Sequence, residues 1–356
     1  MTRRQRNAPA GHDRESGLEE MTTTGRTSRS SGRRSGVPLL LPGSWVEIRP
    51  AAEIIRTLDA DQSLDGLPFM PEMLPFCGRR FRVALRAERT CVHPPEIPFR
   101  RLEGSVVLEG LRCDGSLHGG CQLGCMFFWK EAWLARVSPS RPAATTTEPG
   151  GEPTPPPALR ATSRSDPELY FCQATALPQA TAPGDPFWKP AQYLRLLKVR
   201  TFTLAELLLM FARPGARRIG RLLRSVTPRR TVADVPKEAA LRLEPGEWVE
   251  VKSRDEILRT LDDRRMLKGL SFGGDMYEQC GRQMRVQERV DRVIEERTGR
   301  LRSVHDTVIL EGSICDRYMG CARGMPFLWR EGWLRRVETS PSGEHLPGQP
   351  SVERQA

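Results

Sequence analysis

The sequence predicts a mainly β protein with small helices, built as two tandem copies of one compact barrel. The first observation is a duplication: residues 42–83 match residues 245–286 without a gap at 21 of 42 positions. The second is that both copies close on the same pattern, Trp-Lys/Arg-Glu-x-Trp-Leu-x-Arg-Val, which ends at Val137 and Val337. The third is that each copy offers four or five short strand-like stretches and one small helix, a content that favours a barrel or roll.

Each copy opens with a Pro-Gly turn and an alternating strand, Trp45–Ile48 in the first copy and Trp248–Val251 in the second. A short helix follows, and in the second copy Ser253 and Glu256 stand at the spacing of a capping box. We predict buried stripes on the two helices, formed by Ile54, Ile55 and Leu58 and by Ile257, Leu258 and Leu261. Later strands are predicted at 80–83 and 284–286, 106–108 and 308–310, 126–129, and 133–137.

The end of the first copy, from Phe127 to Val137, resembles the last two strands of SH3-like barrels, which a tight helical turn joins. The resemblance implies two tandem SH3-like barrels. Glu131 and Glu331 each lie between two tryptophans at this turn. We predict that they hold the turn rather than act as general bases.

A wider resemblance covers nearly the whole chain, from about Leu39 to Val337. It rests on Pro-Phe-Met-Pro-Glu-Met at 68–73, Cys-Gly-Arg-Arg at 77–80, Leu-Arg-Cys-Asp-Gly-Ser at 111–116, Phe-Trp-Lys-Glu at 128–131 and Tyr-Phe-Cys-Gln-Ala-Thr at 170–175. In these stretches the chain resembles an uncharacterised bacterial family of two-copy, cysteine-rich proteins. The resemblance therefore implies no particular activity.

Composition divides the rest of the chain into tails, a spacer and a connector. The predicted order is a disordered basic tail at 1–36, the first repeat at 37–138, a Pro/Thr/Ser-rich linker at 139–167, a basic helical connector at 168–238, the second repeat at 239–338 and a disordered tail at 339–356. The sequence has no run of 18 apolar residues and no N-terminal secretory segment, so we expect a cytoplasmic protein.

The formal net charge of +11 is concentrated outside the repeats. Residues 189–230 hold 11 Lys or Arg against one acid, the N-terminal tail carries +4, and everything else sums to −3. Nearly neutral repeats, few aromatic residues among the arginines and no recognised nucleic-acid module argue against a nucleic-acid adaptor, which stays a minor alternative.

The connector itself predicts helices. Thr203 and Glu206 have capping-box spacing, so a helix should start at Thr203, and Pro214-Gly215 should break it. Beyond the break an apolar stripe is surrounded by basic residues, namely Arg217, Arg218, Arg221 and Arg224. This helix either docks on an anionic membrane surface or an acidic partner, or packs its stripe on the flanking domains.

Nine cysteines at clustered spacing in a reducing cytoplasm favour metal ligation or redox chemistry over structural disulfides. In the first copy Cys113, His118, Cys121 and Cys125 fall within 13 residues, and Cys77 lies at an earlier strand. Zinc takes four thiolate or imidazole ligands, and an iron–sulfur cluster takes four cysteines. We therefore predict zinc, with an iron–sulfur cluster as the alternative. The glycines between these residues would permit the tight turns that such a site needs.

The second copy keeps Cys280, Cys315 and Cys321 but has Met325 where the first has Cys125, and no histidine matches His118. It is a site without metal, a site completed by Asp316, His305 or another chain, or a three-thiolate site with an open position. For the whole set, buried core thiols and reversible disulfide formation remain alternatives. Cys91 and Cys172 have no counterpart in the other copy, and we expect each to pack or to be an exposed thiol.

Together these observations predict a cytoplasmic metal-binding accessory or interaction protein. Structural zinc would staple at least the first barrel, and the basic helix would dock on the inner face of a membrane or on an acidic partner. The alternatives are an iron–sulfur protein with redox or Lewis-acid activity and the nucleic-acid adaptor. The sequence identifies no substrate and leaves open whether the protein is an enzyme.

Overall fold

The structure is a computed structural model that describes residues 39–92, 99–138, 159–163, 165–209, 240–315 and 320–337. Both repeats lie in one compact unit, Leu39–Ala356. The predicted tails, most of the predicted linker and the predicted basic helix with Arg217, Arg218, Arg221 and Arg224 lie outside the described residues.

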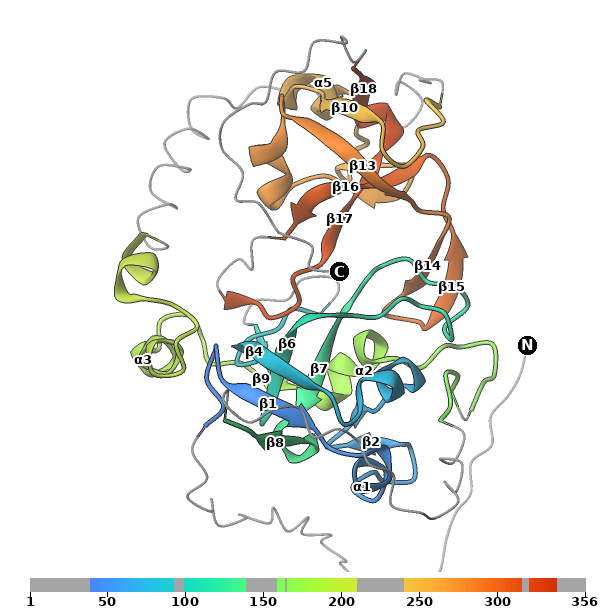
Figure 1. Ribbon diagram of the computed structural model, residues 1–356. Helices are drawn as coiled ribbons and strands as arrows, with labels where there is room; N and C mark the ends of the chain where they lie inside the picture. The colour runs from blue at the N-terminus through green and yellow to red at the C-terminus, as the bar shows by residue number, and fades with distance from the viewer. Residues whose placement is uncertain are drawn as a thin grey trace, which may run out of the picture. The chain divides into compact units, whose positions relative to one another are not determined.

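The elements of the first repeat follow the chain from β1 to β8 (Figure 1). They are β1 (Trp45–Ile48), α1 (Ala51–Ile55), β2 (Ser63–Leu64), β3 (Leu67–Pro68), the 3₁₀ helix η1 (Pro71–Phe76), β4 (Arg80–Arg86), β5 (Arg100–Arg101), β6 (Ser105–Arg112), β7 (Met126–Lys130), η2 (Glu131–Trp133) and β8 (Leu134–Arg136).

The second repeat follows the same order and adds a hairpin. Its elements are β10 (Trp248–Val251), α5 (Arg254–Arg259), β11 (Met266–Leu267), β12 (Leu270–Ser271), η4 (Gly274–Gln279), β13 (Gln283–Arg289), β14 (Arg292–Glu295), β15 (Arg300–Ser303), β16 (Thr307–Ile314), β17 (Pro326–Arg330), η6 (Glu331–Trp333) and β18 (Leu334–Arg336).

Each repeat forms one five-stranded sheet with the same order of strands, β7-β6-β4-β1-β8 and β17-β16-β13-β10-β18. The first strand pairs antiparallel with both β4 and β8 in the first repeat, and with β13 and β18 in the second. The prediction of a mainly β protein made of two equivalent sheets is confirmed. The predicted strands are present, mostly longer than expected, and a short 3₁₀ turn joins the last two strands in each copy.

The β14–β15 hairpin was not predicted, because its sequence is dominated by charged residues and shows little apolar alternation. Its register pairs Arg292 with Ser303 and Glu295 with Arg300. Only Ile294 of the β14 strand is buried. The hairpin therefore forms by backbone pairing and by packing of one side chain.

The connector contains α2 (Gln173–Ala180), β9 (Ala182–Pro183) and α3 (Pro190–Lys198), followed by helical residues 204–209. The capping box predicted at Thr203 is confirmed, because the Thr203 hydroxyl accepts from the Glu206 amide at 3.2 Å and the Glu206 carboxylate accepts from the Thr203 amide at 2.7 Å. The capping box at Ser253 is present as well. Leu159, from the predicted linker, packs against the core of the first repeat.

Two tryptophans and one phenylalanine form the centre of each core. Phe69 meets Trp133 with ring centroids 5.3 Å apart, and Phe272 meets Trp333 at 5.2 Å. The indole N–H of Trp133 donates to the Thr57 hydroxyl at 3.0 Å, and Trp333 makes the same bond to Thr260 at 3.1 Å. These bonds tie the small helix of each repeat to the 3₁₀ turn and satisfy a buried donor.

Helix α2 covers the edge of β7, and the side chain of Gln173 makes the hydrogen bonds to that strand. The Gln173 amide accepts from the Phe128 backbone N–H at 2.8 Å and donates to the Phe128 carbonyl at 2.8 Å. Gln173 thus replaces the neighbouring strand that β7 lacks at this position. The docking fixes the adjacent Cys172 at the start of α2 against the first repeat.

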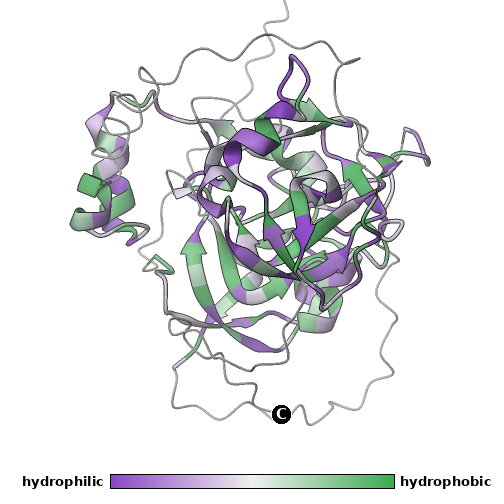
Figure 2. Ribbon diagram, turned by 90° about the horizontal axis from the view of Figure 1, so that it is seen from above, coloured by the Kyte–Doolittle hydropathy of each residue, from purple (hydrophilic) through white to green (hydrophobic). Residues whose placement is uncertain are grey.

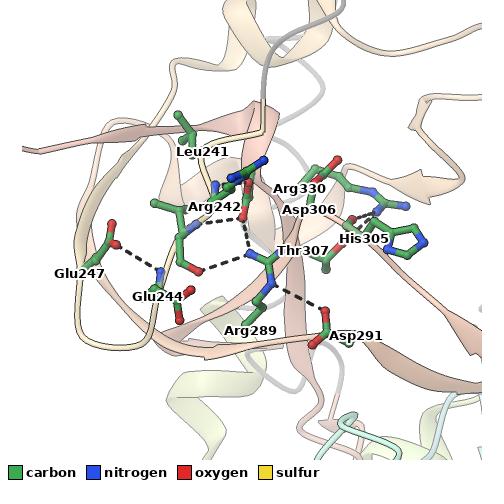
Figure 3. Close-up of polar contacts among 12 residues, drawn as sticks. Leu241, Arg242, Glu244, Glu247, Arg289, Asp291, His305, Asp306, Thr307 and Arg330 are labelled. Atoms are coloured by element: carbon green, nitrogen blue, oxygen red, sulfur yellow. Dashed lines mark hydrogen bonds and ion pairs between the residues drawn. The ribbon is translucent and has the colours of Figure 1, made fainter.

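A buried carboxylate joins three segments of the second repeat. Glu331 in η6 accepts from the backbone amides of Arg242 at 2.9 Å and Leu243 at 3.1 Å, and from the Arg289 guanidinium at 2.9 Å. The Glu331 side chain is 0% exposed. Arg289 also donates to the Leu243 carbonyl at 3.4 Å (Figure 3). The segment before β10, strand β13 and the 3₁₀ turn therefore meet at one carboxylate.

The first repeat has the same arrangement at equivalent positions. Glu131 accepts from the Leu40 amide at 3.4 Å and pairs with Arg86, which donates to the Leu40 carbonyl at 3.0 Å. The prediction that the two glutamates hold the final turn is met by these contacts. We refer to each set of contacts as the glutamate clamp of its repeat.

The two repeats touch through reciprocal backbone contacts. The Gln122 amide of the first repeat donates to the Arg292 carbonyl of the second at 3.0 Å. At the equivalent positions, the Ala322 amide of the second repeat donates to the Arg89 carbonyl of the first at 2.8 Å. In both contacts the donor lies in the loop before the last two strands of one repeat. The acceptor lies at the equivalent position of the other repeat in each case, as in the interface of a two-fold dimer.

A sulfur atom takes part in each of these contacts. The Ile294 amide donates to the Cys121 sulfur at 3.3 Å, and the Cys91 amide donates to the Cys321 sulfur at 3.4 Å. Cys121 and Cys321, which the duplication pairs, therefore stand at the contact between the repeats.

The glutamate clamp generates a stability prediction. Replacing Glu331 by Ala should lower the free energy of unfolding by about 3 kcal/mol, because the half-buried Arg289 charge and two backbone amides lose their acceptor. Urea unfolding followed by tryptophan fluorescence measures the loss. The control is Glu311→Ala, whose carboxylate is exposed and makes one ion pair at 3.7 Å. It should cost less than about 1 kcal/mol. Equal losses in the two variants would contradict the role of the clamp.

Candidate metal centre

Three potential metal ligands meet in the first repeat. Glu72, Cys113 and His118 each offer one ligand atom, and these atoms all lie within 4.8 Å of one another. Glu72 comes from η1, Cys113 follows the end of β6, and His118 lies in the loop after it. Cys113 and His118 were predicted from the sequence, whereas Glu72 was not.

Glu72 is held in place by its helix and by the loop opposite. It lies in η1 between Pro71 and Pro75, and its side chain is only 3% exposed. One carboxylate oxygen, Oε1, accepts from the Leu117 amide at 3.2 Å and meets the His118 Nδ1. The other oxygen, Oε2, is buried and has no hydrogen-bond partner among the described residues. A buried carboxylate oxygen without a partner is costly, so this atom invites a ligand.

His118 is oriented by contacts at both ring nitrogens. Nδ1 faces Glu72, and Nε2 lies 3.3 Å from the carbonyl of Phe171. The ring is 1% exposed. A backbone carbonyl at one nitrogen fixes the tautomer and orientation of a histidine whose other nitrogen can bind a metal.

Cys113 is the thiol of this group. Burial raises its pKa to about 12, and the amide of Gly115, 3.4 Å from the sulfur, acts in the opposite direction. The free thiol is therefore neutral at physiological pH. A bound metal ion would supply the positive charge that a buried thiolate needs.

Three further thiols surround this group. Cys172 and Cys121 both act electrostatically on Cys113, and the same two thiols act on Cys125. Cys113 and Cys125 face each other across the strand ends, where the Cys113 amide donates to the Cys125 carbonyl at 2.8 Å. Burial raises the pKa of each of these thiols. Cys172, expected to pack or to be exposed, is a buried member of this neighbourhood.

Backbone amides point at several of these sulfurs. Leu123 and Ile294 donate to Cys121, and Ala174 and Thr175 donate to Cys172. Together with Gly115 at Cys113, each of the three sulfurs receives the amide two residues further along the chain. Such N–H to sulfur bonds stabilise negative charge on sulfur, which favours the thiolate that a metal requires.

The remaining predicted ligands lie elsewhere. Cys77 and Cys280 pack against the hydrophobic cores of their repeats, and burial raises the pKa of Cys77 to about 11. Cys321 lies beside Cys91, with the two sulfurs 3.4 Å apart. Cys77, Cys280 and Cys321 are therefore not part of the three-ligand group that the described residues contain.

The second repeat keeps part of the arrangement. The Cys315 sulfur lies 3.9 Å from the Asp275 carboxylate, and Asp275 occupies the position that corresponds to Glu72. Asp316, a predicted ligand, lies outside the described residues, and His305 is exposed with its carbonyl bound to Arg330. Glu72 and Asp275 occupy equivalent positions of the two repeats. A comparison of the two copies for shared acidic residues, as well as for shared cysteines, would have found both.

A cavity of about 190 Å³ opens beside the first-repeat site. Cys113 and Cys121 line it from the first repeat, and Glu288 and Ser313 line it from the second. The thiol neighbourhood is therefore adjacent to a space that both repeats shape.

The connector exposes apolar side chains. Phe187 and Trp188, just before α3, are 60% and 71% exposed. Leu194 on α3 and three leucines of the next helical segment, Leu204, Leu208 and Leu209, are exposed as well. The opposite faces of these helices bury Tyr193, Leu196 and Leu207 in a small core of their own. Figure 2 shows apolar and polar stretches on these helices at the left.

In the part of the chain that the structure describes, no helix is both long and apolar enough to cross a membrane. No protein-family model, curated protein or solved structure matches the chain.

The loop that carries the ligands depends on one glycine. Gly115 has a positive φ of +67°, and a Cβ there would stand 1.9 Å from the Cys121 carbonyl oxygen. Gly115→Ala should therefore force the loop apart and increase the alkylation rate of Cys121 by about tenfold or more, since its sulfur would leave its buried position. Mass-spectrometric alkylation kinetics measure this rate.

Gly110→Ala is the matched control. Gly110 has a similar φ of +75°, but a Cβ at this position would meet nothing within 4 Å. Both variants should lose about 1–2 kcal/mol from the backbone conformation, but the control should leave Cys121 unreactive. The same alkylation rate in both variants would show that the close approach of Gly115 to Cys121 does not shape the site.

Proposed function

We propose that the first repeat binds a structural zinc ion through Glu72, Cys113 and His118, with the Cys172 thiolate as the fourth ligand. The observation that carries the proposal is the buried Glu72 oxygen without a partner, in a group whose ligand atoms lie within 4.8 Å of one another. Oxygen, nitrogen and sulfur donors of these types are those that zinc takes in tetrahedral sites.

The surrounding contacts fit such an ion. His118 Nδ1 and the Glu72 carboxylate would hold the ion, while the Phe171 carbonyl keeps its contact with Nε2. Cys172 follows Phe171 directly, so the same segment supplies an orienting carbonyl and the fourth ligand. Among the three neighbouring thiols, Cys172 is favoured because it is the residue next to Phe171, whose carbonyl contacts the His118 ring.

A zinc ion at this place would staple three parts of the chain. The ligands come from η1, from the end of β6 with its loop, and from the start of α2. Four protein ligands close the coordination sphere, which is typical of structural rather than catalytic zinc.

An iron–sulfur cluster is the second candidate. It is favoured by four thiols whose pKa burial raises, those of Cys113, Cys121, Cys125 and Cys172, and by the backbone amides aimed at three of them. Four cysteines with N–H to sulfur bonds are the usual environment of such clusters. In this case Glu72 and His118 would lie outside the cluster.

We further propose that each repeat is an SH3-like barrel. Support comes from the strand order, with the first strand between the second and the last, and from the 3₁₀ turn that joins the last two strands. The architecture by itself implies no function. The proposed role of a cytoplasmic accessory or interaction protein is supported by the closed four-ligand site and by the exposed surface of the connector.

The connector supports a second function, docking on the anionic inner surface of a membrane. Phe187, Trp188 and the exposed leucines form an apolar surface, and Lys198 and Arg200 are exposed beside it. The next stretch of the sequence, 210–230, adds seven arginines and no acid. Aromatic and aliphatic side chains next to basic ones suit the boundary between headgroups and acyl chains.

The metal prediction is tested by metal and sulfide content, with an absorption spectrum, on protein purified without oxygen. We expect about one zinc per chain and no visible band. His118→Ala and Cys113→Ser should each lose the zinc, whereas Cys280→Ser, which changes a core thiol of the other repeat, should keep it. If the protein instead contains iron and sulfide that are lost in Cys125→Ser but kept in His118→Ala, the site holds an iron–sulfur cluster and not zinc. Absence of any metal from protein that refolds with added zinc or iron would reject both.

The docking prediction is tested by flotation with vesicles that contain phosphatidylserine. Trp188→Ala should weaken binding by about tenfold, since burial of a large aromatic side chain contributes about 1.5–3 kcal/mol. Trp248→Ala, which removes another exposed tryptophan from the second repeat, should leave binding unchanged. Binding should also fall in high salt and with neutral vesicles. Equal vesicle binding by the two variants, or no flotation of the wild-type protein, would contradict membrane docking. An acidic protein would then be the partner to test.

A further inference from the structure

Cys91 and Cys321 form a pair of thiols that the proposed metal centre does not use. Cys91 follows β4 of the first repeat, Cys321 precedes β17 of the second, and 230 positions separate them in the sequence. Their sulfurs are 3.4 Å apart. The Cys91 amide donates to the Cys321 sulfur at 3.4 Å, and the Ala322 amide donates to the Arg89 carbonyl at 2.8 Å. Backbone bonds on both sides thus hold the two sulfurs together.

An ion pair lies next to these thiols. Arg323 is bound to Glu296, with one contact at 2.8 Å, and it donates to the Cys91 carbonyl at 3.4 Å. The Arg323 side chain is buried, so its charge is little screened by solvent. A positive charge beside a partly buried cysteine is the environment in which a thiolate forms readily.

The two thiols differ in their protonation. The hydrogen bond from the Cys321 thiol lowers the pKa of Cys91 to about 6, with Arg323 acting in the same direction against the effect of burial. The same hydrogen bond, together with burial, raises the pKa of Cys321. At neutral pH the pair therefore consists of a thiolate on Cys91 and a thiol on Cys321.

We propose that Cys91 and Cys321 are a peroxide-reactive pair that forms a disulfide between the two repeats. The geometry carries the proposal, because the sulfurs need to approach by only roughly 1.4 Å to reach a bond of about 2.05 Å. The duplication does not repeat this pair, because Ile294 stands at the position equivalent to Cys91 and contacts Cys121. The thiol pair therefore occurs at only one of the two reciprocal contacts between the described parts of the repeats, the one in which the Ala322 amide donates to the Arg89 carbonyl.

The chemistry balances with hydrogen peroxide as the oxidant. The Cys91 thiolate attacks one peroxide oxygen, the S–O bond forms, the O–O bond breaks, and hydroxide leaves and becomes water with a proton from solvent. Cys91 is then a sulfenic acid. The Cys321 sulfur attacks the Cys91 sulfur, the S–S bond forms and the S–O bond breaks, and the leaving hydroxide takes the Cys321 proton as water. Sulfur is oxidised, and peroxide is reduced to two waters.

The test uses the full-length protein as purified, treated with hydrogen peroxide at pH 7, blocked with an alkylating reagent and mapped by mass spectrometry. We expect a cross-linked peptide that joins Cys91 to Cys321 and disappears on reduction. In Cys321→Ser the Cys91 sulfenic acid should accumulate and react with dimedone. Cys91→Ile, which introduces the residue of the other repeat, should remove both signals, and Cys315→Ser should keep the cross-link.

A second measurement needs no substitution. Iodoacetamide should alkylate Cys91 of the reduced wild-type protein at least about tenfold faster than Cys77 at pH 7, with a rate that falls as the pH is lowered through 6. A cross-link between other cysteines, dimedone labelling that survives in Cys91→Ile, or a Cys91 no faster than Cys77 would overturn the proposal.

Discussion

In each repeat a single glutamate fixes the geometry on which the rest of the fold depends. Glu331 receives two backbone amides and a guanidinium inside a fully buried space, and Glu131 makes the same kind of contacts at the equivalent position. A buried carboxylate is stable only when every lone pair has a donor. The strand that carries the arginine (β13 or β4), the segment before the first strand and the 3₁₀ turn must therefore meet at one point.

The duplication gave the molecule two copies of the same contact surface, which the repeats use against each other. The loops after β6 and β16 meet β14 and the segment after β4, respectively, through equivalent amides and sulfurs. Once the two contacts were joined in one chain, their sequences were free to differ. One contact now carries Cys121 against Ile294, and the other carries Cys321 against Cys91. The cysteines of one repeat have thereby acquired different surroundings from those of the other.

Divergence of the copies also explains why the two repeats offer different groups of potential metal ligands. The first repeat has glutamate, cysteine and histidine in one buried group, and α2 adds Cys172 to its neighbourhood. The second retains an aspartate next to a cysteine. The metal centre that we propose thus uses a segment outside the duplicated unit, because Phe171 and Cys172 belong to the connector. A staple between the first repeat and α2 would order the connector that carries the exposed apolar surface.

The sequence alone determined the duplication, the positions of the main strands, the capping boxes at Thr203 and Ser253, and the presence of Cys113 and His118 in one site. Each of these depends on local spacing along the chain, which periodicity and capping reveal. Only the tertiary structure brought Glu72 to that site and placed Cys91 against Cys321. These residues lie up to 230 positions apart, and their neighbours are decided by how strands and loops pack. Spacing in the sequence carries no record of such long-range contacts, so the chemistry of the site could be predicted only in part.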